Sequence, residues 1–160
     1  MSHPCRRPRR AGVVDAMPTT DIRTALTDDD RAFLARPLHG FLSVAGGPVP
    51  PQPRPVWFEA TDDGTVQLFT GPESLHIRRR RKDPRASLVV AAPVGERERW
   101  IAVEGGTTVE TDGAHALAQR LAQRYWDLDD PTRAADLAAI LAEDQVRLVI
   151  HPERVRRLMF

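Results

Sequence analysis

The chain has 160 residues and a formal net charge of +1, with 41% hydrophobic and 28% charged residues. These values suit one globular domain with a packed core, and the near-zero charge disfavours a protein whose whole surface binds nucleic acid. Cys5 is the single cysteine, so neither an internal disulfide nor a cysteine cage for a metal can form, and a reducing, cytoplasmic environment is expected.

The first 26 residues are rich in proline and arginine, and we interpret residues 1–26 as a flexible tail. They contain no apolar h-region, so a secretory signal is not expected. No later segment approaches the roughly 18 to 20 apolar residues that cross a bilayer, so no membrane partner is expected. The ordered domain is predicted to occupy residues 27–160.

A short helix is predicted to begin after Thr27, because a threonine N-cap with Asp30 three positions later suits a capping box, and to end before Pro37. Residues 39–45 and 54–60 alternate in the manner of β-strands, with a proline-rich connection between them. Asp63-Gly64 predicts a hairpin turn into a strand over residues 65–70.

Gly71-Pro72 predicts the end of that strand and the start of a short helix that ends at Asp83-Pro84. Two more strands follow, over residues 86–93 and 99–110, and two central glycines in the second predict a bulge or bend. Asp112 and Asp130 are the predicted N-caps of two helices, the second with Pro131 at its first position. The chain closes with a strand over residues 145–152.

About six strands with few, irregularly placed helices predict an α+β fold with a mainly antiparallel sheet rather than a doubly wound parallel one. A small antiparallel sheet protects its edges best by closing into a barrel. The expected architecture is therefore a six-stranded barrel with peripheral helices.

The strongest chemical pattern is the segment 70–85, TGPESLHIRRRRKDPR. A strand end followed by a helix start exposes backbone N–H groups that can bind an anion. Hydroxyl and cationic side chains that could hold a phosphate follow closely: Thr70, Ser74, His76, Arg78 and Arg79. This predicts a phosphate clamp for a nucleotide-like cofactor.

Two other interpretations of this segment stay open. It could be a solvated basic face, because Lys82 is the only lysine beside 22 arginines and the whole sequence is biased toward arginine. Five consecutive cations could also attract RNA or DNA. The nucleic-acid interpretation is disfavoured, because no aromatic platform or helix-turn-helix pattern accompanies the run. The five histidines are too widely spread to predict a metal site, and no hydrolase triad motif occurs.

Aromatic residues mark a second region. Trp57 and Phe58 are adjacent in a predicted strand, so one should face the core and the other a pocket, a second layer or a partner. Tyr125-Trp126, near the end of a predicted helix, is interpreted as helix packing.

In order and spacing, these segments resemble the pyridoxamine 5′-phosphate oxidase-like split-barrel family, which has FMN-dependent and coenzyme F420-dependent members. The resemblance covers about residues 31–160. It rests on the PVWF motif, residues 55–58, the Asp63-Gly64 turn, a strand ending at Thr70, and KDPRASL, residues 82–88. The serine and arginine positions of the family correspond to Ser74 and Arg78. The usual lysine is His76 here, and the usual Asn-Leu pair is Arg79-Arg80.

The resemblance implies a six-stranded split β-barrel that forms a homodimer, with the cofactor in a groove between the subunits. It implies a flavin- or deazaflavin-dependent oxidoreductase that transfers hydride to or from a small-molecule substrate through bound FMN or F420. The phosphate would contact Ser74, His76, Arg78 and Arg79, and Thr70 would contact the phosphate or the ribityl hydroxyls. The ring would lie against Val56, Trp57 and Phe58. The changed lysine position favours one alternative, a non-catalytic split barrel that binds a cofactor or haem.

Overall fold

A computed structural model describes residues 21–159, which form eight strands and four helices. The strands are β1 (Asp21–Arg23), β2 (Gly40–Val44), β3 (Arg54–Val56), β4 (Glu59–Ala60), β5 (Val66–Thr70), β6 (Arg85–Ala91), β7 (Arg99–Glu110) and β8 (Val146–Met159). The helices are α1 (Asp28–Leu34), α2 (Leu75–Arg80), α3 (Ala114–Tyr125) and α4 (Pro131–Ala142).

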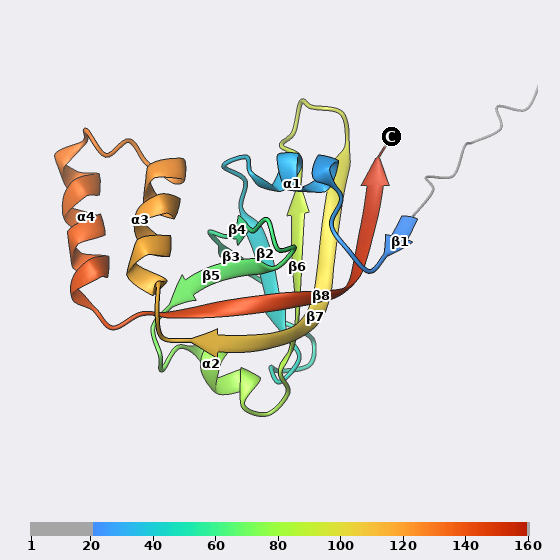
Figure 1. Cartoon of the computed structure of the whole chain (residues 1–160), viewed down its shortest axis with the longest axis horizontal. Helices are drawn as coiled ribbons and strands as arrows, with labels where there is room; N and C mark the ends of the chain where they lie inside the picture. Colours follow the sequence, from blue (N-terminus) through green and yellow to red (C-terminus); the bar gives the residue numbers. More distant parts are fainter. Residues whose placement is uncertain (1–20, 160) are drawn as a thin grey trace, which may run out of the picture.

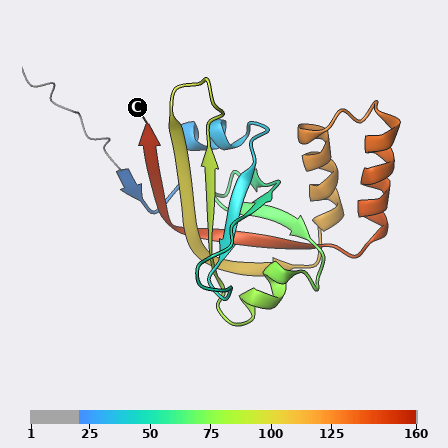
Figure 2. The same ribbon diagram turned by 180° about the vertical axis from the view of Figure 1, so that it is seen from behind.

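All strand pairs are antiparallel, in the order β3-β2-β6-β7-β8-β5-β4, and β1 adds to β8. The sheet curls into a half-barrel, with α1 and α2 at opposite ends and the α3–α4 hairpin standing at one side (Figure 1). The view from behind shows β2 and β3 in front of the curled sheet (Figure 2). This confirms the predicted α+β, mainly antiparallel barrel with peripheral helices.

The prediction of six strands was too low, for two reasons. Residues 21–23 were assigned to the tail, yet they form β1 on the long strand β8, and Leu26 is 6% exposed. Residues 1–20 of the predicted tail lie outside the described residues. The predicted strand over residues 54–60 is interrupted at Trp57 and Phe58, because β3 pairs with β2 whereas β4 pairs with β5.

The barrel core follows from strand alternation, which β6 shows clearly. Ala86, Leu88 and Val90 are buried, whereas Val89 between them is 37% exposed on the outer face. Because successive strand residues point to opposite faces, the same pattern on the other strands fills the interior with large aliphatic side chains and Phe58. The core therefore forms from local patterning that the sequence already contains.

The long strands β7 and β8 bend together at a bulge. Their register shifts between Glu104 and Gly105. A Cβ at Gly105 would lie 1.8 Å from the backbone oxygen of His151, so only glycine permits this approach. The predicted bulge at the central glycines is confirmed.

The helix starts agree in part with the sequence. Thr27 caps α1 in a capping box with Asp30, and Asp130 caps α4 with Pro131 at its first position, as predicted. The predicted cap of α3 at Asp112 is wrong, because Gly113, with φ of 75°, occupies that position. Helix α2 begins at Leu75, later than the start predicted at Gly71-Pro72. The Ser74 hydroxyl accepts a hydrogen bond from the Ile77 backbone N–H, and this cap sets the start of the helix.

None of the four helices in the described residues is long and apolar enough to cross a bilayer.

Candidate cofactor site

The candidate site lies where the barrel splits. Between β3 and β4 the chain leaves strand β2 and joins strand β5, so no ladder spans Trp57 and Phe58. A hollow of about 300 Å³ occupies this gap, lined by His39, Pro55, Val56, Trp57 and Phe69. It is apolar and aromatic, as expected of a surface that receives a planar ring.

Trp57 forms the aromatic wall of the hollow. Its indole stacks on the Tyr125 ring at 5.1 Å and 9°, and meets Trp126 edge-on at 4.5 Å. Phe69 contacts its other side edge-on at 6.3 Å. Tyr125 and Trp126 were predicted to be packing residues of a helix, and they pack against this wall.

A minority of the arginines lack acidic partners, and one of them directly precedes the wall of the hollow. Most arginines in the described region are ion-paired, but five have no carboxylate oxygen within 4.0 Å among residues 21–159: Arg54, Arg78, Arg79, Arg80 and Arg97. The paired arginines are Arg31, Arg36, Arg81, Arg85, Arg99, Arg120, Arg124, Arg133, Arg147, Arg154, Arg156 and Arg157. Positive charge that no protein carboxylate neutralises is available to an anionic ligand.

His76 joins Arg54 and Arg79 in one cluster, which we call the cation cluster. The His76 side chain is half-buried, and this burial, together with the charges of Arg54 and Arg79, lowers its pKa below the usual 6.5. The free protein therefore holds His76 mostly neutral at pH 7. An anion bound between the two guanidinium groups would reverse the effect of their charges.

The position of Arg79 follows from a close backbone approach. A Cβ at Gly46 would lie 2.1 Å from the Arg79 carbonyl oxygen, so glycine lets α2 pack against the loop after β2. The Arg79 side chain then lies beside Gly47, and its guanidinium donates to Gln52 Oε1 at 3.4 Å. Arg54, at the start of β3, directly precedes Pro55 in the hollow wall. The cluster is thus linked to the hollow through the Arg54-Pro55 step of β3.

The structure separates the residues that the sequence grouped together. Val56 and Trp57 line the hollow, and Thr70 directly follows its Phe69. The Phe58 side chain is fully buried in the core, so it supports the hollow from behind and is not open to a ligand. Ser74 caps α2.

The arginine run after His76 divides into several roles. Arg78 is exposed, and Arg79 belongs to the cation cluster. Arg80 points inward and donates to the Thr107 backbone oxygen and hydroxyl, at 2.5 Å and 2.9 Å. Arg81 pairs with Glu73 on the surface. Of the five consecutive cations at residues 78–82, Arg79 therefore joins the cation cluster and Arg80 has a structural role.

Arg54 is the site residue that the sequence analysis missed. It lies 22 residues before His76, outside the 70–85 segment, and only the fold brings the two together. The signal available in the sequence was its place at the first position of the strand that carries PVWF.

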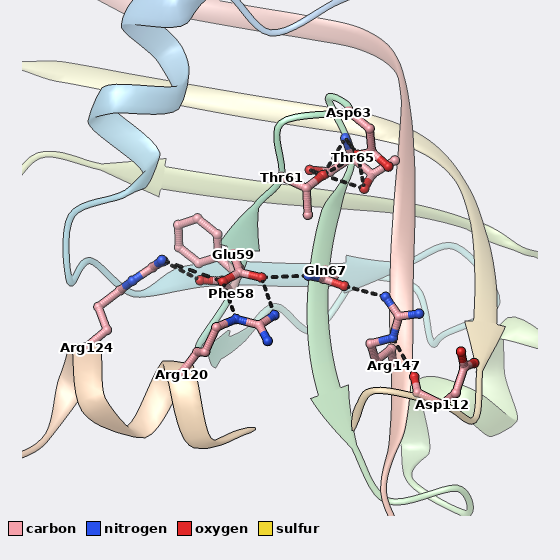
Figure 3. A network of polar contacts seen from close by, with 10 residues as sticks. All are labelled: Phe58, Glu59, Thr61, Asp63, Thr65, Gln67, Asp112, Arg120, Arg124 and Arg147. Atoms are coloured by element: carbon pink, nitrogen blue, oxygen red, sulfur yellow. Dashed lines mark hydrogen bonds and ion pairs between the residues drawn. The ribbon is translucent and has the colours of Figure 1, made fainter. Parts of the chain in front are cut away.

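Glu59, two residues after Trp57, is the centre of a network of polar contacts (Figure 3). Glu59 accepts two hydrogen bonds from Arg120, at 3.0 Å and 2.8 Å, and one from Gln67 at 2.6 Å. The hydrogen bonds from Arg120 lower the pKa of Glu59, and they outweigh the opposing effect of burial. Glu59 is therefore a charged anchor for α3.

No family model matches the chain, and no curated protein matches it in sequence. Solved structures do match its fold. An F420 reductase aligns with a TM-score of 0.60 and 21% identity over 81% of this chain and 98% of that one. A FAD-binding protein of Mesorhizobium loti aligns with a TM-score of 0.54 and 21% identity over 87% of this chain and 99% of that one. A Listeria innocua protein described as a candidate pyridoxamine 5′-phosphate oxidase aligns with a TM-score of 0.55 and 17% identity over 81% of this chain and 95% of that one. The chain therefore shares its split-barrel fold with proteins named for F420 and flavin chemistry.

Proposed function

We propose that this protein is an oxidoreductase that uses FMN or F420 to transfer hydride to or from a small-molecule substrate. The observation that carries the proposal is the cation cluster of Arg54, His76 and Arg79, in which neither arginine pairs with a described carboxylate. Its Arg54 directly precedes Pro55 in the wall of an aromatic hollow. The fold that the chain shares with proteins named for F420 and FAD supports it.

The residues suit the two parts of such a cofactor. Arginine forks bind phosphate oxygens in pairs, and the Trp57 and Phe69 rings offer flat apolar surfaces to a tricyclic ring. When bound, the cofactor would supply the hydride chemistry, and the chain would supply orientation and exclusion of water. Ser74 and Arg78 remain predicted phosphate contacts, and Thr70 a contact to phosphate or ribityl hydroxyls.

The proposed protein is a homodimer, and the outer face of the sheet supports this. Phe41 and Val89 are cross-strand neighbours there, 46% and 37% exposed. A polar row of Ser43, Ser87 and Glu104 borders them on the same face. An apolar centre with a polar margin is typical of a self-complementary interface.

Binding is tested by titrating the purified chain with FMN and with F420, following fluorescence and visible absorption. We expect one of the two to bind with a Kd in or below the micromolar range, and the bound reduced cofactor to be reoxidised by a small-molecule acceptor. Tight binding without turnover would favour the carrier alternative. Failure of both to bind would refute the proposed function.

His76 makes the expected binding pH-dependent. Its pKa is lowered in the free protein and rises when a phosphate neutralises the neighbouring arginines, so binding takes up a proton. Affinity should therefore fall as pH rises between the two pKa values, by at most about tenfold per pH unit. Kd measured from pH 6 to pH 8 should rise more steeply for the natural chain than for His76→Lys, whose charge is constant there. Parallel pH profiles for the two proteins would show that His76 does not contact the anion.

A further inference from the structure

Helix α3 is fastened to the barrel by two arginines that share one carboxylate. Arg120 forms a two-pronged ion pair with Glu59, and Arg124 lies 3.9 Å from the same carboxylate (Figure 3). Arg124 also donates to the Phe58 backbone oxygen at 3.1 Å. The Glu59 side chain is only 16% exposed, so this contact is partly shielded from solvent.

Glu59 is itself held in place from the barrel side. Gln67 donates to Glu59 Oε2 at 2.6 Å and accepts from Arg147 at 2.8 Å, and Gln67 is 5% exposed. Arg147 in turn pairs with Glu110 and donates to the Asp112 backbone oxygen at 2.7 Å. A chain of contacts therefore runs from α3 across β4 and β5 to β8 (Figure 3).

The same end of α3 holds the aromatic wall of the hollow. Tyr125 follows Arg124 directly, stacks on Trp57, and donates its hydroxyl to the Leu38 backbone oxygen at 2.5 Å. Trp57 lies two residues before Glu59, so each residue of a three-residue segment contacts α3: Trp57 through a ring stack, Phe58 through its backbone oxygen and Glu59 through an ion pair. Helix α4 buries no residue, so the contacts of α3 carry the attachment of the hairpin.

We propose that Glu59 is a positioning residue: by fixing Arg120 and Arg124, it sets the orientation in which Tyr125 and Trp126 hold the Trp57 indole at the hollow. The identity of the ring that this wall would receive rests on the proposed function. The effect of Glu59 on Trp57 does not, because it needs no ligand.

The physical reason is the spacing of the two arginines. Arg120 and Arg124 are four residues apart and therefore face the same side of α3. Without the carboxylate, two like charges would lie together beside the Phe58 carbonyl and Trp57. Their repulsion would loosen the last turn of the helix, which carries Tyr125.

The first test uses the full-length chain without ligand. Near-ultraviolet circular dichroism reports the fixed contacts among Trp57, Tyr125 and Trp126, and we expect Glu59→Gln to reduce this signal by about half with an unchanged far-ultraviolet spectrum. Glu73→Gln is the matched control, because it removes an exposed ion pair with Arg81, away from the three rings. It should leave both spectra unchanged. A folded Glu59→Gln protein with the natural near-ultraviolet spectrum would overturn the proposal.

Arg120→Met provides a second route, should Glu59→Gln fold poorly. It removes the two-pronged contact from a side chain that is half exposed, and it leaves Glu59 paired with Arg124 and Gln67. We expect a smaller loss of the same near-ultraviolet signal. No loss in this variant would equally contradict the positioning role.

The second test separates the ring from the phosphate. Riboflavin has the ring of FMN without its phosphate, and dephosphorylated F420 serves the same purpose for the deazaflavin. Glu59→Gln should weaken binding of the phosphorylated cofactor and of its phosphate-free counterpart by about tenfold each, so the ratio of their two Kd values stays constant. A change in that ratio would show an effect on the phosphate instead. If the natural chain binds no probe, the proposed function fails, while the dichroism still decides the role of Glu59.

Discussion

Replacing Arg54 and Arg79 together by alanine is expected to weaken binding of FMN or F420 by roughly 150- to 20,000-fold. Each guanidinium would contribute a hydrogen bond to a charged phosphate, worth about 1.5–3 kcal/mol, so the pair contributes about 3–6 kcal/mol. The domain should stay folded, because Arg54 is exposed and neither arginine pairs with a described carboxylate. Isothermal titration calorimetry of the natural and variant proteins measures the difference.

The matched control removes the same amount of charge at the C-terminal end of α2. Arg81→Ala with Lys82→Ala also lowers the net charge by two, but both side chains are exposed and Arg81 is already paired with Glu73. This control should change affinity by no more than a few-fold, through long-range attraction alone. Equal losses in the two double variants would show that the cation cluster attracts the cofactor only by its general charge.

Asp30→Asn is expected to lower the free energy of unfolding by about 3–5 kcal/mol, because it breaks a buried ion pair. Asp30 is 1% exposed and accepts two hydrogen bonds from Arg157 Nε, at 2.8 Å and 2.9 Å. It also accepts from the Thr27 backbone N–H at 2.7 Å, so the substitution weakens the cap of α1 as well. Urea denaturation at pH 7 measures the loss.

The effect of Asp30 should depend on pH. Burial raises its pKa, but the hydrogen bonds from Arg157 and Thr27 outweigh burial and hold the pKa below 3.8. Because the folded-state pKa lies below the unfolded-state value, the stabilisation is complete above pH 4 and is lost as pH falls through the folded-state pKa. The difference in free energy of unfolding between the natural chain and Asp30→Asn should therefore shrink as the pH falls. Asp29→Asn, which removes an exposed pair with Arg99, should cost less than about 1 kcal/mol.

Local chemistry made much of the fold predictable. The Asp63-Gly64 turn, with φ of 87° at the glycine, the Thr27 capping box and the Asp130-Pro131 start each depend on residues within a few positions of one another. The errors at α2 and α3 were also local. The cap of α3 is Gly113, one residue after the predicted Asp112, and α2 begins after Ser74 and not at Gly71-Pro72.

The missed features depend on distant partners. The strand over residues 54–60 breaks because its halves pair with β2 and β5, which stand on different sides of the barrel. Strand β1 exists through its pairing with β8, more than a hundred residues away. Sequence periodicity contains no information on such pairings.

The same distinction applies to the candidate site. The run after Gly71-Pro72 indicated the right neighbourhood, but five adjacent cations could not be told apart before the fold placed them. Arg80 contacts Thr107 in β7, whereas the charges of Arg79 and Arg54 act on His76. Trp57 and Phe58 face different environments, as predicted, although both lie in the break between β3 and β4 and not within one strand. The fold assigned Phe58 to the core.

A crystal structure of the chain with bound FMN or F420 tests the central claim most directly. We expect the phosphate within hydrogen-bond distance of the guanidinium groups of Arg54 and Arg79, and the ring in the hollow beside Trp57 and Phe69. A second protomer should close that hollow. A phosphate bound elsewhere, with Arg54 and Arg79 facing solvent, would contradict the account.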